Sequence, residues 1–389
     1  MAASLRESGH LSELRQMDKK AIIRVCICGG GSQSHVAAAM IGSLPGYAVD
    51  VLTRRPDEWV KSFTGIDPEG KRYEATLNIV TSRPEDTIPF ADVVYICLPG
   101  FAFASQMERI REYLRPDAII GSSFGGSGFF LRAFEIFGLG VSAFCFQRVP
   151  AIGRPLEYGH IADIQGYKPL LKVACVNIER PLEFKGMLEE WFRTPVEQLS
   201  HWLEATLSNS NPLLHPASMS VLFKDWEPGR IYERVPELYM DWTDEASRRW
   251  LACDEELHEV MSRLPMDGRE VPSLKDYYEV DGVEALTRKI RSIKAFRDKP
   301  APMKRVEGGY QIDTDHRLFT EDVDFGLIMI KSIAESVGVA TPSIDHLIEW
   351  AQRVMGKEYL VDGRLVGRDL AGTLTATRLQ EFLKRDAKA

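Results

Sequence analysis

Three consecutive glycines near the start of the chain stand where a dinucleotide-binding turn requires them. Gly29, Gly30 and Gly31 directly follow the apolar run AIIRVCIC and precede SHVAAAMIGSL, which has the composition of a helix. The backbone N–H groups of such a turn and the start of the next helix bind the negatively charged pyrophosphate of a dinucleotide. An ordinary strand–helix turn is the alternative, but the strand before the glycines and the strands after them favour a cofactor.

The neighbouring residues extend this predicted cofactor site. Ser34 replaces the third glycine of the usual fingerprint and is small enough for close helix packing, while His35 begins the helix beside the turn. The predicted cofactor-binding residues are Gly29, Gly30, Gly31, Ser32, Ser34, His35, Arg54, Arg55 and Pro99.

The end of the second predicted strand indicates which nucleotide is bound. An acidic residue there would accept the ribose hydroxyls of NAD(H), but the chain reads VLTRRPDEW and has Arg54 and Arg55 instead. A guanidinium group suits a 2′-phosphate, so NADP(H) is expected to be preferred, with NAD(H) possible. Two arginines in an ordinary solvated turn are the alternative.

A histidine in the second half of the chain has the chemistry of a proton donor. His215 lies in LSNSNPLLHPAS, where Asn211 and Pro212 predict the cap and first turn of a helix. Histidine titrates in the range useful for general acid–base catalysis. A hydrogen-bonded core histidine is the alternative that the residues alone leave open.

The surrounding pattern divides the chain into two halves. Up to about Cys175, short apolar runs alternate with amphipathic segments, which is typical of a parallel sheet covered by helices. KRYEATLNIVTS is expected to form an extra hairpin or extended excursion. After about Pro195 the apolar spacing becomes helical. The predicted fold is α/β plus all-α: an extension (1–20), a Rossmann dinucleotide-binding domain (21–195) and a mostly α-helical domain (196–389), with the boundary near 192–201.

Composition limits the possible partners. The 389-residue chain has a formal net charge of −8, which argues against a nucleic-acid surface. It has no run long enough to cross a bilayer and no signal peptide, and its six cysteines show no metal-ligand spacing. A cytoplasmic protein without a metal site is expected. A monomer and a homodimer are both compatible with the sequence.

Three segments together resemble the opine dehydrogenase family, which includes octopine and nopaline dehydrogenases. They are CGGGSQSH, NPLLHPA and HRLFTEDVDFGL, and the closing PSIDHLIEWAQRVMGKEYLVDGRLVGRDL is similar as well. The resemblance spans residues 22–370. It implies a cleft between two domains in which an amino acid and a 2-oxo acid condense to an imine that NADH or NADPH reduces, giving an oxidoreductase that acts on CH–NH bonds.

The resemblance also implies roles for residues at matching positions. The catalytic histidine corresponds to His215, its acidic partner to Asp322, and the arginine that holds the oxo-acid carboxylate to Arg317. A carboxylate fixes the tautomer of an imidazole, and a guanidinium binds a carboxylate through two hydrogen bonds. Thr320 is expected to cap a helix that carries Asp322 in its first turn.

The substrates are less defined. Pyruvate is the family's usual oxo acid, but Gln147 stands where arginine-using relatives have an acid, which argues for a neutral or acidic amino acid. Gly residues in SSFGGSGFF are expected to let the backbone approach nicotinamide or substrate. The predicted substrate-binding residues are Arg317, Gln147, Arg148, Asn211 and Tyr277. Packing in the core is an equal alternative for Tyr277.

Two other functions fit the same residues. One is a simple 2-oxo-acid reductase of this architecture that forms a hydroxy acid without an amine. The other is a nucleotide-binding protein without turnover, and the complete set of His215, Arg317 and Asp322 argues against it.

Overall fold

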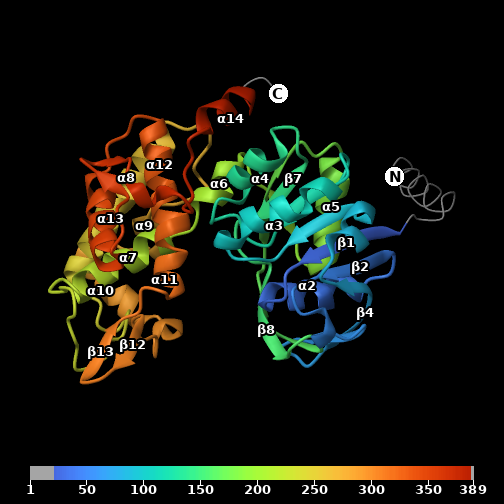
Figure 1. Cartoon of the computed structure of the whole chain (residues 1–389), viewed down its shortest axis with the longest axis horizontal. Helices are drawn as coiled ribbons and strands as arrows, with labels where there is room; N and C mark the ends of the chain where they lie inside the picture. Colours follow the sequence, from blue (N-terminus) through green and yellow to red (C-terminus); the bar gives the residue numbers. More distant parts are fainter. Residues whose placement is uncertain (1–21, 387–389) are drawn as a thin grey trace, which may run out of the picture.

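The computed structural model of the chain describes residues 22–386 and forms two lobes joined side by side (Figure 1). The predicted N-terminal extension, 1–20, lies outside the described residues. One lobe is built on a twisted sheet and the other is mostly helical, as the two patterns in the sequence predicted. The α/β plus all-α fold class is thus confirmed.

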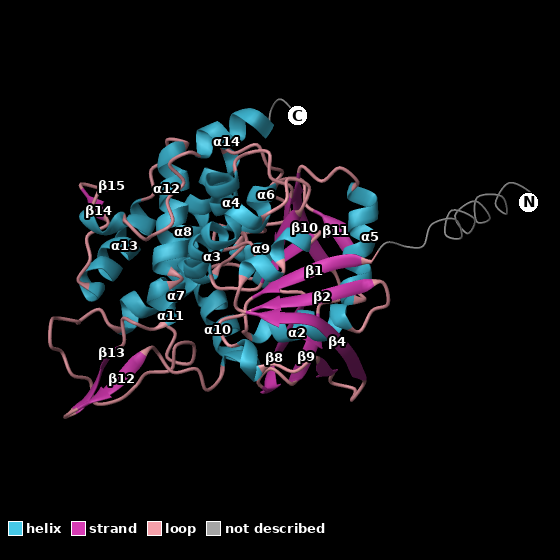
Figure 2. Ribbon diagram, turned by 45° about the vertical axis from the view of Figure 1, so that its right-hand side comes forward, coloured by secondary structure: helices cyan, strands magenta, loops and turns pink. Residues whose placement is uncertain are grey.

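Six parallel strands form the centre of an 11-stranded sheet, in the order β4-β2-β1-β5-β6-β7 (Figure 2). This is the strand order of a Rossmann fold, in which the chain crosses over at β1. The strands are β1 (Ile23–Cys28), β2 (Tyr47–Leu52), β4 (Arg72–Thr81), β5 (Val93–Ile96), β6 (Ile119–Ser122) and β7 (Ala143–Phe146).

The sheet continues beyond this core on both sides. The added strands are β3 (Ser62–Ile66), β8 (Ala151–Glu157), β9 (Ile161–Tyr167), β10 (Leu171–Val176) and β11 (Val196–Gln198). The expected extra hairpin exists as β3–β4, but β4 also pairs with β2 in parallel, with Leu77 opposite Val49. KRYEATLNIVTS is therefore an integral strand, and describing it as an excursion was wrong.

Helices on both faces cover the apolar strands of this lobe. They are α2 (Ser32–Gly42), α3 (Phe103–Ile110), α4 (Phe129–Phe137) and α5 (Pro181–Phe192). Trp191 of α5 and Phe144 of β7 are fully buried, with ring centroids 6.4 Å apart, so the sheet and its helices share one core.

The second lobe begins after β11 and contains helices and two short ribbons. Its longer helices are α6 (Trp202–Leu207), α7 (Asn211–Leu222), α8 (Asp244–Ser262), α9 (Leu274–Tyr278), α10 (Val283–Ser292), α12 (Ile328–Ser336), α13 (Pro342–Met355) and α14 (Leu379–Asp386). Between them lie α11 (Arg317–Thr320), the π-helical segment η7 (Val323–Leu327) and the ribbons β12–β13 (Met303–Val306, Gly309–Ile312) and β14–β15 (Leu360–Val361, Arg364–Leu365). Because β11 pairs with β10, the sheet extends three residues past the predicted boundary at 195.

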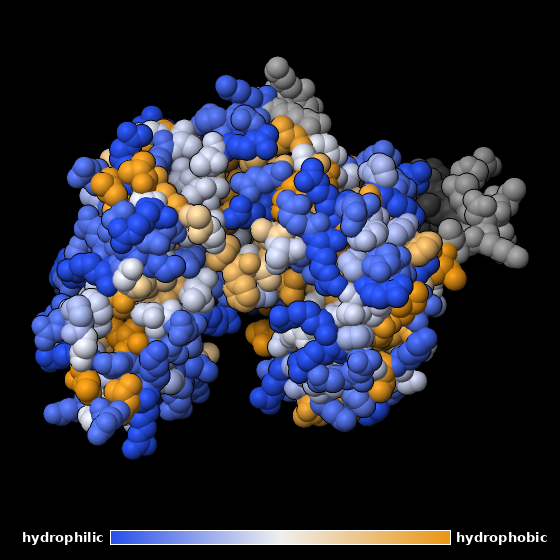
Figure 3. Space-filling model, in the orientation of Figure 1, coloured by the Kyte–Doolittle hydropathy of each residue, from blue (hydrophilic) through white to orange (hydrophobic). Residues whose placement is uncertain are grey.

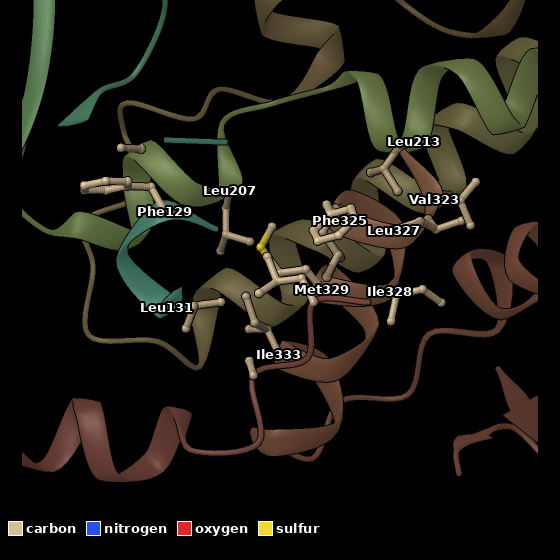
Figure 4. Packing of buried hydrophobic residues seen from close by; sticks show 14 of the residues in the cluster. Phe129, Leu131, Leu207, Leu213, Val323, Phe325, Leu327, Ile328, Met329 and Ile333 are labelled. Atoms are coloured by element: carbon tan, nitrogen blue, oxygen red, sulfur yellow. The ribbon is translucent and has the colours of Figure 1, made fainter. Parts of the chain in front are cut away.

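An apolar cluster joins the lobes. Phe129 and Leu131 of α4 are fully buried, and they lie beside Met329 of α12 and Leu207 of α6 (Figure 4). Farther along the chain, Phe382 of α14 contacts Phe134, with ring centroids 5.2 Å apart. Residues of both lobes therefore belong to one buried apolar cluster.

In the described part of the chain, no helix combines the length and apolar character needed to span a membrane.

A buried histidine forms hydrogen bonds that connect the glycine turn between β1 and α2 to the rest of the lobe. Gly29 has φ +138°, a value that other residues rarely adopt, and a Cβ there would lie 2.6 Å from the Cys97 carbonyl oxygen. His35 is fully buried, and its Nε2 accepts a hydrogen bond from the Gly159 N–H at 2.8 Å. Nδ1 therefore carries the proton and donates to the Gly31 carbonyl at 2.9 Å. His35 thus ties the turn to the segment between β8 and β9.

This arrangement predicts that His35 stabilises the fold in its neutral form. Burial lowers the pKa of His35 from its usual value of 6.5. The unfolded chain therefore binds a proton that the folded chain excludes, and the contribution of His35 is present at neutral pH and lost as the pH falls below about 6.5.

We expect His35→Ala to lower the free energy of unfolding by about 1–3 kcal/mol at pH 7.5, because the buried N–H of Gly159 loses its partner. Denaturant unfolding at pH 7.5 and pH 5.5 measures this. The difference in free energy of unfolding between wild type and variant should be smaller at the lower pH. His346→Ala, at an exposed histidine, is the matched control. An equal difference at both pH values would contradict the prediction that His35 stabilises the fold in its neutral form.

Candidate active site

The carboxyl ends of the parallel strands place most of the predicted cofactor residues at one edge of the sheet. Gly29 follows β1, Arg54 lies two residues after β2, and Pro99 follows β5, while the predicted substrate residue Arg148 follows β7. In a doubly wound sheet this edge is where nucleotides bind. The edge faces the helical lobe, and Figure 3 shows the cleft between the two lobes.

The start of α2 fits a pyrophosphate. Gly31 is the N-cap residue, no side chain caps the helix, and its first turn contains no acidic residue. A Cβ added at Gly31 would meet no atom within 4 Å, so the space in front of the helix is open. Ser34 is fully buried behind the turn, where its small side chain allows the helix to lie close to Gly29. The residues present therefore fit a dinucleotide.

The two arginines after β2 have different surroundings. The Arg55 guanidinium lies 3.8 Å from the centre of the Tyr158 ring and bonds to Glu58 at 3.2 Å. Arg54 is exposed and forms no hydrogen bond or ion pair with the residues that the structure describes. Arg54 is thus the more available cation at the position of the adenosine ribose.

His215 and Asp322 form a buried hydrogen-bonded pair. Nδ1 of His215 lies 2.6 Å from Oδ2 of Asp322, and the two residues are 6% and 4% exposed. Since a carboxylate can only accept, Nδ1 carries the proton, and the acid fixes the tautomer of the imidazole. The sequence had left a hydrogen-bonded core histidine open as an alternative. The structure shows that the partner is a carboxylate 107 positions away in the chain.

The other nitrogen of the imidazole contacts a residue that the sequence did not single out. Nε2 of His215 lies 2.8 Å from the Tyr239 hydroxyl, which donates to it when the histidine is neutral. Burial and the nearby Asp322 raise the pKa of Tyr239, so the phenol keeps its proton. Its ring stacks on Phe296 at 4.2 Å. Tyr239 lies in VPELYMDW, where no spacing or motif distinguishes it from a core tyrosine.

Close packing of two helical segments brings the pair together. Gly326 of η7 faces Pro212 of α7, and a Cβ at Gly326 would lie 2.3 Å from the Pro212 ring. Only glycine allows this approach, which sets Asp322, just before η7, against His215 in the second turn of α7. Single π-turns of this kind are common at functional sites.

The predicted helix starts need correction. The N-cap of α7 is Ser210, and Asn211 is the first helical residue, with its N–H bonded to the Asn209 side chain at 3.2 Å. Thr320 does not cap a helix but ends α11, whose N-cap is His316. Nδ1 of His316 accepts from the Leu318 N–H at 3.3 Å, and this bond starts the helix four residues earlier than expected.

Arg317 begins α11, on the side of the helical lobe that faces the sheet lobe (Figure 1). Its side chain is 68% exposed and forms an ion pair with Glu321 at 3.2 Å. The Glu321 side chain is only 12% exposed and accepts bonds from Ser127 Oγ at 3.4 Å and from the backbone N–H of Gly100. Burial raises the pKa of Glu321, which Arg317 opposes. Arg317 is therefore tethered beside the strand ends.

The other predicted substrate residues surround the same region. Gln147 donates from Nε2 to the Glu270 carbonyl at 2.8 Å, and Arg148 donates to the Ser208 carbonyl at 2.6 Å, so both reach from β7 to the helical lobe. Tyr277 is 63% exposed, which is incompatible with packing in the core. The Asn211 side chain is half-buried at the start of α7. The glycines after β6 pack against the helical lobe, since a Cβ at Gly126 would lie 2.7 Å from Asn209.

A separate surface groove, of about 1150 Å³, lies at the opposite edge of the sheet and contains none of the predicted site residues. No group of three or more potential metal ligands occurs among residues 22–386.

Comparisons with known proteins agree with this architecture. Residues 198–355 match the model of the NAD/NADP octopine/nopaline dehydrogenase alpha-helical domain. Octopine dehydrogenase of Pecten maximus is 30% identical over 90% of this chain and 95% of its own length. Tauropine dehydrogenase of Arabella iricolor is 28% identical over 92% and 98%, respectively.

Solved structures show the same two-lobed fold. Octopine dehydrogenase in complex with NADH and L-arginine superposes with a TM-score of 0.83 at 28% identity, covering 93% of this chain and 98% of that one. NADP⁺-bound yersinopine dehydrogenase has a TM-score of 0.69 at 12% identity over 95% of this chain and 100% of its own, which is a likeness of fold alone. The chain therefore belongs to the opine dehydrogenase family of pyridine-nucleotide-dependent oxidoreductases, as its motifs predicted.

Proposed function

We propose that this chain condenses an amino acid with a 2-oxo acid, by default pyruvate, and reduces the resulting imine to a secondary-amine dicarboxylate. The amine and the carbonyl lose water to form the C=N bond, and the bound nicotinamide supplies the hydride that reduces it. Related proteins are named octopine, tauropine and opine dehydrogenases, and octopine dehydrogenase has been solved with NADH and pyruvate.

The observation that carries this proposal is the buried pair of His215 and Asp322. Loss of water from the condensing substrates and reduction of the imine both need a proton at a defined position, and a positioned imidazole can supply it. Asp322 holds the ring in one orientation and supports its charged form. Tyr239 contacts the nitrogen that faces away from Asp322, so a proton that enters or leaves Nε2 passes next to this hydroxyl.

Arg317 supports the orientation of the oxo acid. A guanidinium binds a carboxylate through two parallel hydrogen bonds, which fixes the direction of the adjoining carbonyl. The bonds that Glu321 accepts from Gly100 and Ser127 keep Arg317 close to the carboxyl ends of β5 and β6. The oxo-acid carbonyl would then lie between the cofactor edge and His215.

The surroundings of Gln147 argue against a cationic amino donor. Gln147 is a neutral amide whose N–H₂ group is already bonded to the Glu270 carbonyl, so it offers no charge to a guanidinium or ammonium side chain. Glu270 itself pairs with Lys172. A neutral or acidic amino acid fits these residues better than arginine does.

The defining experiment follows oxidation of NADPH and NADH by purified protein with pyruvate, with and without each of the twenty amino acids. Oxidation that requires both the amine and the oxo acid is expected. Oxidation with pyruvate alone would instead identify a simple oxo-acid reductase.

We expect His215→Asn to lower kcat by about 10²–10⁴-fold, the usual contribution of a positioned general acid–base group. Asp322→Asn should have a similar effect, because an amide no longer fixes the productive tautomer. Steady-state kinetics measures kcat of the two variants, and a fluorescence titration measures their affinity for NADPH. Cofactor affinity should stay nearly intact, and its loss in either variant would show that these residues do not act in the chemical step.

Tyr239→Phe tests the contact at Nε2. Removal of the hydroxyl keeps the stack on Phe296 but leaves the buried Nε2 without its partner, so we expect a decrease in kcat of about tenfold and a loss of stability of about 1–3 kcal/mol. Tyr232→Phe is the matched control, because the Tyr232 hydroxyl is buried without a hydrogen-bond partner among the described residues. Equal kcat in the two variants would show that the Tyr239 hydroxyl does not contribute to turnover.

Arg54→Ala should reduce the preference for NADPH over NADH by about ten- to a hundredfold, since a charge-assisted bond to a 2′-phosphate contributes about 1.5–3 kcal/mol. Arg55→Ala is expected to have a smaller effect, because Arg55 is engaged with Glu58 and Tyr158. The ratio of kcat/KM for the two cofactors measures this. If Arg54→Ala weakens both cofactors equally, the 2′-phosphate assignment is wrong.

A further inference from the structure

Arg148 links the cofactor edge of the sheet to the segment that carries His215. It follows β7 by two residues, and its guanidinium donates to the carbonyl and the hydroxyl oxygen of Ser208, at 2.6 and 3.3 Å. Ser208 ends α6, three residues before α7 begins. The cation therefore lies between the lobes, on the His215 side of the cleft.

Arg148 has no carboxylate partner among the described residues, although neighbouring cations do. Its acceptors are the backbone carbonyls of Ser208 and Gln147 and the Ser208 hydroxyl, which carry only partial charge. By contrast, Arg317 pairs with Glu321, and Lys172 pairs with Glu270. Arg148 is exposed to solvent, although surrounding protein lowers its pKa, and a guanidinium remains charged at neutral pH.

The guanidinium also keeps unused hydrogen-bond donors. Its bonds to Ser208 and Gln147 use the two terminal nitrogens, and Nε bonds to none of the described residues. Arginine has five N–H groups, so a carboxylate can bind without displacing Ser208. The site is thus preorganised for a second acid group.

Aromatic residues connect Arg148 to the proposed acid–base pair. Tyr277 and Tyr278 lie near enough to act electrostatically on Arg148, and Tyr278 acts in the same way on Tyr239. Tyr239 in turn bonds to Nε2 of His215. Tyr278 is thus within electrostatic reach of both Arg148 and Tyr239.

We propose that Arg148 binds the acid group of the amino donor, while Arg317 holds that of the oxo acid. This inference rests on the proposed function. The product of that reaction has one acid group on each side of its secondary amine, and the cleft offers one guanidinium for each. Arg148 is thus the residue that makes the enzyme require an amino acid, or an amine with an equivalent acid group, rather than a simple amine.

The test uses the amino acid that supports the fastest oxidation of NADPH with pyruvate. It compares this amino acid with the corresponding amine, which lacks the carboxylate. We expect Arg148→Met to lower the amino-acid-to-amine ratio of kcat/KM by about tenfold or more, because only the acid group loses its charged partner. The change should appear in the KM of the donor and leave that of pyruvate nearly unchanged, whereas Arg317→Met should do the reverse. Arg148→Lys should restore part of the ratio.

Arg154→Met is the matched control, because Arg154 is an exposed arginine of β8 paired with Asp163. Calorimetric titration of the enzyme–NADPH complex with the amino acid gives the same comparison without turnover, and weaker binding in Arg148→Met is expected. An unchanged ratio, or an equal loss for the amino acid and the amine, would overturn the proposal and leave Arg148 as a strut between the lobes. Wild-type enzyme that shows no amine-dependent oxidation would instead overturn the proposed function, and this inference with it.

Discussion

The hydrogen bond between His215 and Asp322 is the constraint around which the helical lobe is arranged. A carboxylate that is 4% exposed is costly unless it is paired, so the surrounding helices must hold its partner at bonding distance. Gly326 permits the close approach of η7 to α7 that this distance requires. The packing of the lobe thereby determines the orientation of the imidazole, and Tyr239 completes its hydrogen bonds.

The second requirement is that this pair faces the cofactor. The contacts that hold the lobes together include the apolar cluster around Phe129 and Met329, the bonds of Glu321 to Gly100 and Ser127, and the bond of Arg148 to Ser208. The polar contacts lie at the strand ends, whereas the apolar cluster packs helices of the two lobes against each other (Figure 4). Residues proposed to position substrates therefore also hold the two lobes together.

Much of the fold could be predicted from local patterns, because a glycine turn between a strand and a helix and a change from strand to helical spacing are both local signals. The resemblance to opine dehydrogenases singled out His215, Arg317 and Asp322 as candidates. Tyr239 was missed because its bond to His215 is a contact across the fold. The starts of α7 and α11 shifted because Ser210 and His316 cap them, and β4 was misjudged because its pairing with β2 is long-range.

The most direct test of the account uses NADPH or NADH deuterated at the transferred position, together with pyruvate and the amino acid that supports the fastest oxidation. Mass spectrometry then locates the deuterium. The account predicts a secondary amine with one deuterium on the carbon that came from the pyruvate carbonyl. Deuterium in the corresponding 2-hydroxy acid, with the amino acid unchanged, would contradict it.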